Sequence, residues 1–185
     1  KVLADCICTS ANAREIVQAM DTSTILFGPD RNLAYYVQKV TSKRIIPVPE
    51  HGNCPTHHQI ALEDLLQAKE AHPNATVIVH PECIPEVQDR ADYLASTSGM
   101  VKICKELEDE EFVIGTEVGL LHRLEREAPG KRFYPISTTA VCPQMKMPTL
   151  EKIEAALENE KPEVILSPEV MEKARKPIER MLALS

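Results

Sequence analysis

The sequence predicts an α/β fold built from repeated three-layer units, in which small parallel sheets are flanked by helices and related by pseudo-symmetry. Two observations predict it. Short apolar runs alternate with segments whose apolar residues recur at helical spacing, which is typical of parallel strands covered by helices. The chain also repeats itself, because Gly28 recurs as Gly115 after 87 residues and Cys54 as Cys142 after 88. A period of that length indicates a duplicated α/β unit rather than a solenoid.

The repeat divides the chain into three parts. We expect residues 1–54 to form an incomplete α/β unit, because the first copy begins in the middle of the repeat. Residues 55–142 contain a complete unit. Residues 143–185 lack the repeat pattern and are expected to form a helical tail.

In the first unit, turn-forming residues separate the expected elements. The hydroxyls of Thr9-Ser10 are natural N-caps, because a hydroxyl oxygen can accept a hydrogen bond from a free backbone N–H. Gly28-Pro29-Asp30 ends a buried strand and precedes a second helix. The expected order is strand 4–8, helix 11–20, strand 25–27, a helix that includes 33–37, and strand 45–48.

The second unit follows the same order, preceded by one more strand and two more helices. Ser96-Thr97 occupies the position of Thr9-Ser10 in the repeat and is expected to begin a helix. Thr149 and Ser167 are expected to begin two helices of the tail. The elements expected in this unit are a helix that follows Pro55 and is broken by Pro73-Asn74, strand 77–79, helix 85–90, strand 93–95, a helix to 107, strand 112–114, helix 116–127 and strand 133–136.

The composition excludes several classes of partner. The formal net charge is −7 and the pI is about 5.4, so no nucleic-acid surface is expected. No apolar run is long enough to cross a membrane and no signal peptide is visible, so no membrane partner is expected. Six cysteines without close spacing indicate a reducing compartment, and we expect a cytoplasmic protein.

Polar residues follow several of the expected strands, and parallel sheets bind ligands beyond the carboxyl ends of their strands. The pairs Thr9-Ser10 and Ser96-Thr97 occupy equivalent positions of the repeat. Hydroxyls and free N–H groups at a helix start favour anions. Simple helix capping is the alternative for either pair alone, and their equivalence favours a shared anion site.

One histidine and one carboxylate are candidates for acid–base chemistry. His80 and Glu82 are two residues apart at a strand end, so their side chains project to the same side. A histidine and a carboxylate placed in this way suit proton transfer, although a structural hydrogen bond fits the spacing equally well. His57 lies three residues after Cys54 near a helix start, where a solvated histidine is the simpler interpretation.

The repeat also distinguishes among the six cysteines. Cys54 and Cys142 occupy the same position of the repeat, so this position is cysteine in both copies. At the positions of Cys6, Cys8 and Cys104 the other copy has a different residue type, and these three cysteines fit small buried side chains. Zinc sites usually show two cysteines at short spacing, which is absent here. Single thiolates on separate loops fit an iron–sulfur cluster held between domains.

Seven short motifs, spread over essentially the whole chain, occur in the same order as in the quinolinate synthase (quinolinate synthetase A) family, which the sequence therefore resembles. The resemblance implies three similar α/β domains around a pseudo-threefold axis, of which two are present here and the N-terminal one is lacking. The tail would pack on that first domain. The motifs occupy residues 8–13, 27–34, 52–57, 80–83, 96–100, 115–117 and 142–147.

The resemblance also implies the chemistry. The family condenses iminoaspartate with dihydroxyacetone phosphate to quinolinate in NAD biosynthesis, and a [4Fe-4S] cluster acts as a Lewis acid. Cys54 and Cys142 match two cluster ligands, and the third cysteine is expected from the absent N-terminal domain. Cys83 matches a position that is not a ligand. Glu82 is implied to move the proton and His80 to orient a substrate oxygen.

Further residues match the lining of the family's active site: Ser10, His57, His80, Glu82, Ser96 and Thr97. The implied partners are the two small anionic substrates and an oxidase that supplies iminoaspartate. The alternative interpretation is a truncated, non-catalytic fragment of that scaffold that binds a metal or an anion. Quinolinate formation would separate the enzyme from the fragment.

Overall fold

The structure is a computed structural model that describes residues 1–185. The chain divides into two compact units. The main unit comprises residues 8–141, and the terminal unit comprises residues 1–7 and 142–185. Each of the two repeat copies contributes its own parallel sheet to the main unit, as the α/β prediction requires.

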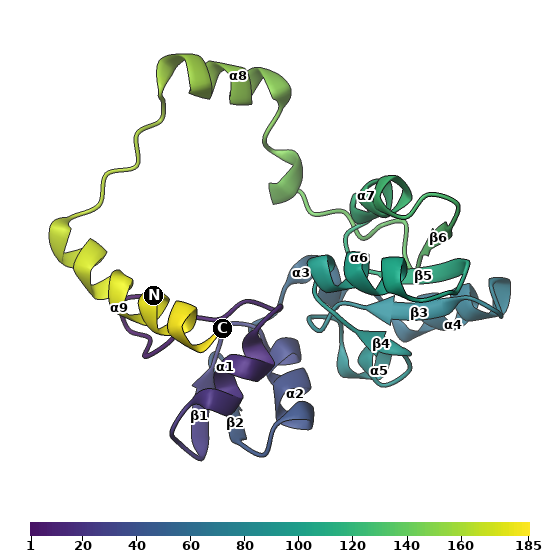
Figure 1. Ribbon diagram of the computed structural model, residues 1–185, viewed down its shortest axis with the longest axis horizontal. Helices are drawn as coiled ribbons and strands as arrows, with labels where there is room; N and C mark the ends of the chain where they lie inside the picture. The colour runs from purple at the N-terminus through teal and green to yellow at the C-terminus, as the bar shows by residue number, and fades with distance from the viewer. The chain divides into compact units, whose positions relative to one another are not determined.

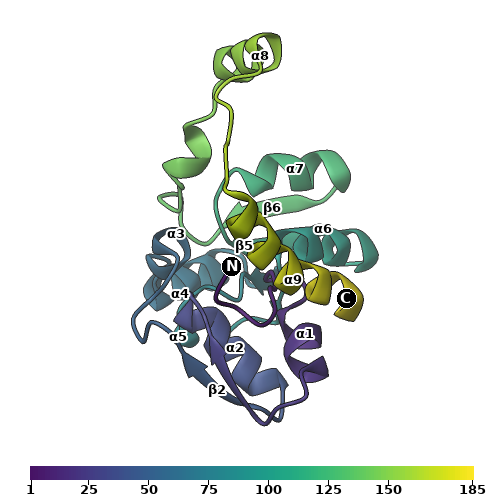
Figure 2. The same ribbon diagram turned by 90° about the vertical axis from the view of Figure 1, so that its left-hand side faces the viewer.

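The sheet of the first copy contains two parallel strands, β1 (Thr24–Phe27) and β2 (Arg44–Pro47). Helix α2 (Arg31–Val40) connects them, and α1 (Ala13–Ala19) lies beside α2 (Figure 2). Apolar residues of all these elements form one core. It contains Ala13, Val17, Phe27, Leu33, Ala34 and Val37, with Ile25 and Ile45 packed against it.

The sheet of the second copy has four parallel strands in the order β4-β3-β5-β6, seen side by side in Figure 1. The order places the first strand of the copy inside the sheet, as right-handed crossover connections allow. The strands are β3 (Thr76–Val79), β4 (Tyr93–Leu94), β5 (Glu111–Gly115) and β6 (Arg132–Pro135).

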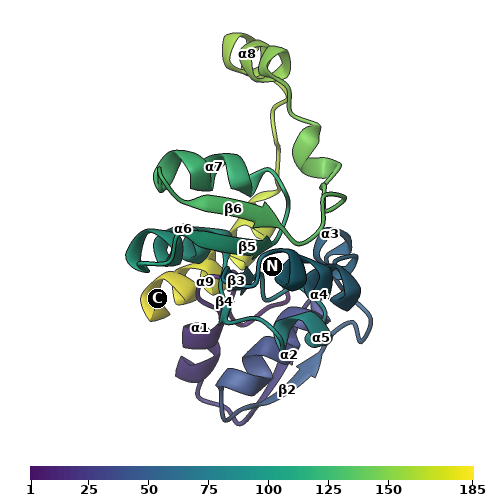
Figure 3. The same cartoon turned by 90° about the vertical axis from the view of Figure 1, so that its right-hand side faces the viewer.

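Alternating residues of these strands face two separate cores, which is the expected three-layer arrangement. Val77, Val79 and Val113 pack with α4 (Leu62–Ala71) and α5 (Pro85–Gln88). Ile78, Phe112 and Ile114 pack with α6 (Thr97–Glu106) and α7 (Leu120–Glu127). The four helices therefore cover both faces of one sheet (Figure 3).

The expected strand at residues 4–8 is wrong, because these residues form no strand. Their counterpart in the second copy is β4, which pairs only with β3. The first sheet has no strand equivalent to β3 beside β1, so residues 4–8 lack a neighbour with which to pair.

Two helix starts also differ from expectation. The single helix expected between Pro55 and Pro73 is two helices, α3 (Pro55–His58) and α4, because Ile60 N–H donates to the His57 carbonyl and the Asp64 carboxylate accepts from Ala61 N–H. The helix expected from 116 begins only at α7, because the Glu117 carboxylate accepts from Gly119 N–H and holds a turn.

The terminal unit carries a single-turn 3₁₀ helix, η1 (Gln144–Lys146), and two longer helices. Thr149 and Ser167 cap α8 (Leu150–Asn159) and α9 (Pro168–Leu184), as the sequence predicts. Ile7 N–H donates to the carbonyl of Pro177, which lies inside α9. No helix in the protein combines the length and the apolar character that a membrane crossing requires.

Candidate functional site

The site lies beyond the carboxyl ends of the strands in the main unit. Cys54 lies in the loop after β2 and precedes α3, which carries His57. His80 and Glu82 follow β3, and Thr116 follows β5. Segments from both copies of the repeat therefore meet at one place, where parallel sheets usually bind ligands.

His57 makes contacts through both of its ring nitrogens, and its contact with Cys54 joins the two copies. Its Nδ1 lies 3.2 Å from Cys54 Sγ and 3.1 Å from Glu82 Oε2. Its Nε2 lies 2.9 Å from Thr116 Oγ1. The ligand atoms of Cys54, His57 and Glu82 all lie within 4.8 Å of one another, close enough to hold one metal ion.

His80 stacks on His57, with ring centroids 4.1 Å apart and planes 12° apart. Its Nδ1 accepts a hydrogen bond from Glu82 N–H at 3.2 Å, so in the neutral ring the proton lies on Nε2. The contact of 3.9 Å between His80 Nδ1 and Glu82 Oε2 is too long for a hydrogen bond. Glu82 therefore pairs with His57 rather than with His80.

The stacked rings have opposite charge preferences. Burial and the neighbouring charge of His57 lower the pKa of His80 to about 4. Burial also acts against the charge on His57, but the hydrogen bonds with Cys54 and Glu82 outweigh it and raise the pKa of His57 to about 9. Burial would raise the pKa of Glu82, yet its hydrogen bond to His57 lowers it. Near neutral pH the group therefore contains neutral His80, cationic His57 and anionic Glu82.

Asp30 fixes the position of the Cys54 backbone. Its Oδ1 accepts from Leu33 N–H at the start of α2, and its Oδ2 accepts from Cys54 N–H, each at 2.7 Å. Burial raises the pKa of Asp30, against these two hydrogen bonds that lower it. The loop after β1 also runs close to the loop after β2. A Cβ on Gly28 would lie 1.9 Å from the Val48 carbonyl oxygen, so only glycine fits there.

A cavity of about 350 Å³ opens beside these groups. Three of the sequence-predicted site residues line it, Ser10, Cys54 and Glu82. Thr9 and Ser10 do not cap α1, contrary to expectation, because Asn12 precedes that helix and its side-chain oxygen accepts from Thr9 N–H at 2.8 Å. Ser10 is therefore available to the cavity as a half-buried hydroxyl.

The other predicted residues lie in different surroundings. Ser96 caps α6 as expected, because its hydroxyl oxygen accepts from Gly99 N–H at 3.2 Å, and the neighbouring Thr97 is exposed. Cys142 belongs to the terminal unit, so its predicted proximity to Cys54 stays a prediction. Cys83 is fully buried, its Sγ donates to the Gly115 carbonyl, and burial raises its pKa to about 12. Such a thiol is unsuited to binding a metal.

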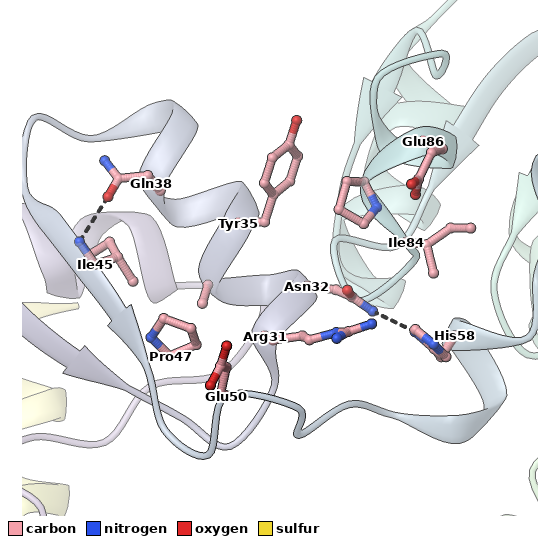
Figure 4. Close-up of a pocket in the computed structure, with 12 residues that line it drawn as sticks. Arg31, Asn32, Tyr35, Gln38, Ile45, Pro47, Glu50, His58, Ile84 and Glu86 are labelled. Carbon is pink, nitrogen blue, oxygen red and sulfur yellow. Dashed lines mark hydrogen bonds between the residues drawn. The ribbon is translucent and has the colours of Figure 1, made fainter.

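A larger cavity of about 610 Å³ lies between α2, β2 and the start of α5 (Figure 4). Arg31, Tyr35, His58 and Glu86 line it, but Cys54 and Glu82 do not. We therefore assign the chemistry to the smaller cavity, which the thiol and the carboxylate face.

Sequence reasoning missed two buried amides behind the site, Asn32 and Gln88, which are 1% and 2% exposed. Asn32 Nδ2 donates to the Glu82 carbonyl at 2.9 Å, and Gln88 Nε2 donates to the carbonyls on either side of it. The only signal in the sequence is an amide at a position of each helix that otherwise faces the core.

Comparison with known proteins gives one family. The profile described as quinolinate synthetase A protein matches residues 1–183. Quinolinate synthase of Methanocaldococcus jannaschii is 53% identical over 188 residues, which cover 100% of this chain and 61% of the relative. Those of Thermodesulfovibrio yellowstonii and Pyrococcus horikoshii are 50% and 48% identical and are covered to 60% and 61%. The chain thus spans about three fifths of the length of these curated relatives.

Proposed function

Because the chain belongs to the quinolinate synthetase A family, we propose that it forms the main part of the active site of a quinolinate synthase. The reaction would be the condensation of iminoaspartate with dihydroxyacetone phosphate to quinolinate in NAD biosynthesis. The observation that carries the proposal is the group Cys54, His57 and Glu82, whose ligand atoms lie within 4.8 Å of one another beside a cavity that Ser10 also lines.

The donor chemistry of the site fits an iron–sulfur cluster. Cys54 is half-buried at the cavity, and Asp30 holds its backbone N–H so that the loop presents the thiol there. Cys142 would be the second ligand, and the third would come from a further domain of the kind that the family resemblance implies. When bound, a [4Fe-4S] cluster with one open iron would supply a Lewis acid.

The chain's own residues would move protons and hold the substrates. Glu82 is anionic and lines the cavity, so it can take a proton from a substrate carbon. Cationic His57 shares its Nδ1 proton between Cys54 and Glu82 and would stabilise negative charge on both. Neutral His80 has its Nε2–H available to donate to a substrate oxygen. The hydroxyls of Ser10, Ser96 and Thr97 would bind the anionic groups of the substrates.

A second candidate function is a metal-binding module without catalysis. Cys54, His57 and Glu82 offer sulfur, nitrogen and oxygen to one ion, which is a ligand set that zinc accepts. The same residues would then hold a single ion in place of a cluster.

One experiment separates the two candidates. The full-length protein is purified without oxygen, its iron, sulfide and zinc are measured, and it is then supplied with the two substrates. Iron, sulfide and quinolinate formation support the synthase. Stoichiometric zinc without sulfide and without quinolinate would instead support the module, and would contradict the proposed function.

A further inference from the structure

The turn that carries Glu82 has three consecutive backbone carbonyls, and each accepts a hydrogen bond from a buried side-chain amide. Gln88 Nε2 donates to the carbonyls of Pro81 and Cys83, both at 2.8 Å. Asn32 Nδ2 donates to the carbonyl of Glu82 at 2.9 Å. The turn has no strand partner for these carbonyls, so the two amides replace the hydrogen bonds that a sheet would supply.

The same two amides also join the two copies of the repeat. Gln88, at the end of α5, donates to the backbone carbonyl of Asn32 in α2 at 3.0 Å. Asn32 Nδ2 also lies 3.3 Å from His58 Nδ1, the contact drawn in Figure 4. The turn is therefore held from α2 on one side and from α5 on the other.

The side-chain nitrogen of Gln88 is hydrogen-bonded, whereas its side-chain oxygen is not. Gln88 Nε2 lies within 3.0 Å of three carbonyl oxygens, whereas Gln88 Oε1 is buried without a hydrogen-bond partner. A buried polar atom without a partner lowers stability, so packing alone does not account for a glutamine at this position. What the glutamine provides is a rigid set of donors beneath the turn.

From this geometry we propose that Asn32 and Gln88 are positioning residues for Glu82. By fixing the backbone of the Pro81–Cys83 turn, they hold the Glu82 carboxylate 3.1 Å from His57 Nδ1 and at the edge of the cavity. Neither amide is a catalytic residue, because each acts only through the turn. The inference rests on the role of Glu82 in the proposed function.

The first test replaces Gln88 by methionine, which keeps the length of the side chain and removes the donors. In the full-length enzyme we expect Gln88→Met to lower kcat on the order of 10–100-fold, because a displacement of about 1 Å at a reacting group costs that much. KM and the cluster absorbance should change little. Gln38→Met is the matched control, because Gln38 is an exposed glutamine that donates to the Lys43 carbonyl, and its kcat should stay normal.

The second test asks whether the amide acts through Glu82. In a Glu82→Gln background, Gln88→Met should cause no further loss of kcat, because two groups that act as a unit are not additive. A merely structural role would lower kcat by the same factor in both backgrounds, and this result would overturn the proposal. Asn32→Leu, which is close in shape and has no donor, should behave like Gln88→Met.

The outcomes distinguish this inference from the proposed function. If Glu82→Gln loses turnover while Gln88→Met and Asn32→Leu do not, only the positioning role is wrong. If Glu82→Gln itself turns over normally, the assigned role of Glu82 is wrong and the inference falls with it. If neither amide variant folds, the amides are structural and the proposal is overturned.

Discussion

At the scale of single residues, the site is an electrostatic arrangement of two stacked histidines and one carboxylate. The sequence pairs His80 with Glu82, because the two share one side of a strand end. The structure pairs Glu82 with His57 instead, at 3.1 Å, and leaves His80 neutral beneath the cationic ring. This exchange of partners depends on where α3 meets β3 in space, so spacing along the chain could not show it.

Glu82 is the residue whose loss should separate catalysis from cluster binding. In the full-length enzyme we expect Glu82→Gln to lower kcat on the order of 10²–10⁴-fold, the usual contribution of a general acid or base. The amide keeps the shape of the carboxylate but cannot accept a proton. Quinolinate release and cluster absorbance measure the two effects. Loss of the cluster would show that Glu82 is structural, and near-normal turnover would remove it from the mechanism.

The two fully buried thiols should make stability depend on alkaline pH. Burial raises the pKa of Cys83 to about 12 and that of Cys104 to about 11, from the ordinary thiol pKa of 9.0. Below pH 9 both thiols are neutral in both states. Above pH 9 the unfolded chain releases these protons first, so the stability that the neutral thiols contribute is lost as pH rises towards 11 and 12.

We therefore expect the free energy of unfolding to fall above pH 9 by up to about 1.4 kcal/mol per pH unit for each thiol. Urea unfolding under reducing conditions at pH 8.5 and 10.5 would measure it. Cys83→Ala should show a smaller decrease between the two pH values. Val87→Ala removes a buried side chain of the same core without a thiol, and it should keep the full decrease. An equal decrease in both variants would contradict the assignment.

At the scale of the elements, most strands were predictable, the strand expected at 4–8 being the exception, and the turns that place the site were not. The strand predicted at 77–79 lies at Thr76–Val79, because a run of buried β-branched residues has few alternatives. The break between α3 and α4 was missed, because it depends on one side chain, Asp64, reaching back to Ala61. The roles of Asn32 and Gln88 were missed because their carbonyl partners lie outside the helices that carry them.

The close contact between the loops after β1 and β2 should not tolerate a methyl group at Gly28. Gly28→Ala places a Cβ 1.9 Å from the Val48 carbonyl oxygen, so we expect it to cost at least about 1–3 kcal/mol of stability and to displace the loop that carries Cys54. Thermal unfolding and cluster content of the full-length protein measure the two effects.

Gly130 provides the matched control, because its φ of +92° strains an alanine while nothing lies within 4 Å of the new Cβ. Gly130→Ala should lower stability by about 1–2 kcal/mol and leave the cluster content normal. If Gly28→Ala kept both its stability and its cluster, the contact between the two loops would not position Cys54.

At the scale of the whole molecule, the internal repeat predicts that Cys54 and Cys142 act together. They are the two cysteines that occur at the same position of both copies, and they follow β2 and β6, the equivalent last strands of the two sheets. Each of the other cysteines that has an equivalent position in the second copy is aligned with a different residue type there. Because the two cysteines share one position of the repeat, we expect each to supply a thiolate to the same cluster.

In the full-length protein, Cys54→Ser and Cys142→Ser should therefore each abolish the cluster, since two thiolates cannot replace three. Iron and sulfide content after anaerobic purification measures the loss. Cys104→Ser is the control, because Cys104 is a buried thiol on the core side of α6. The fraction of this variant that folds should retain iron and sulfide.

In the protein without cluster, the sulfurs of Cys54 and Cys142 should lie within about 10 Å, since Fe–S bonds are near 2.3 Å. A short bifunctional thiol reagent should then join Cys54 to Cys142, and failure to join them, or a Cys142→Ser variant with full iron content, would show that the repeat does not build a shared site.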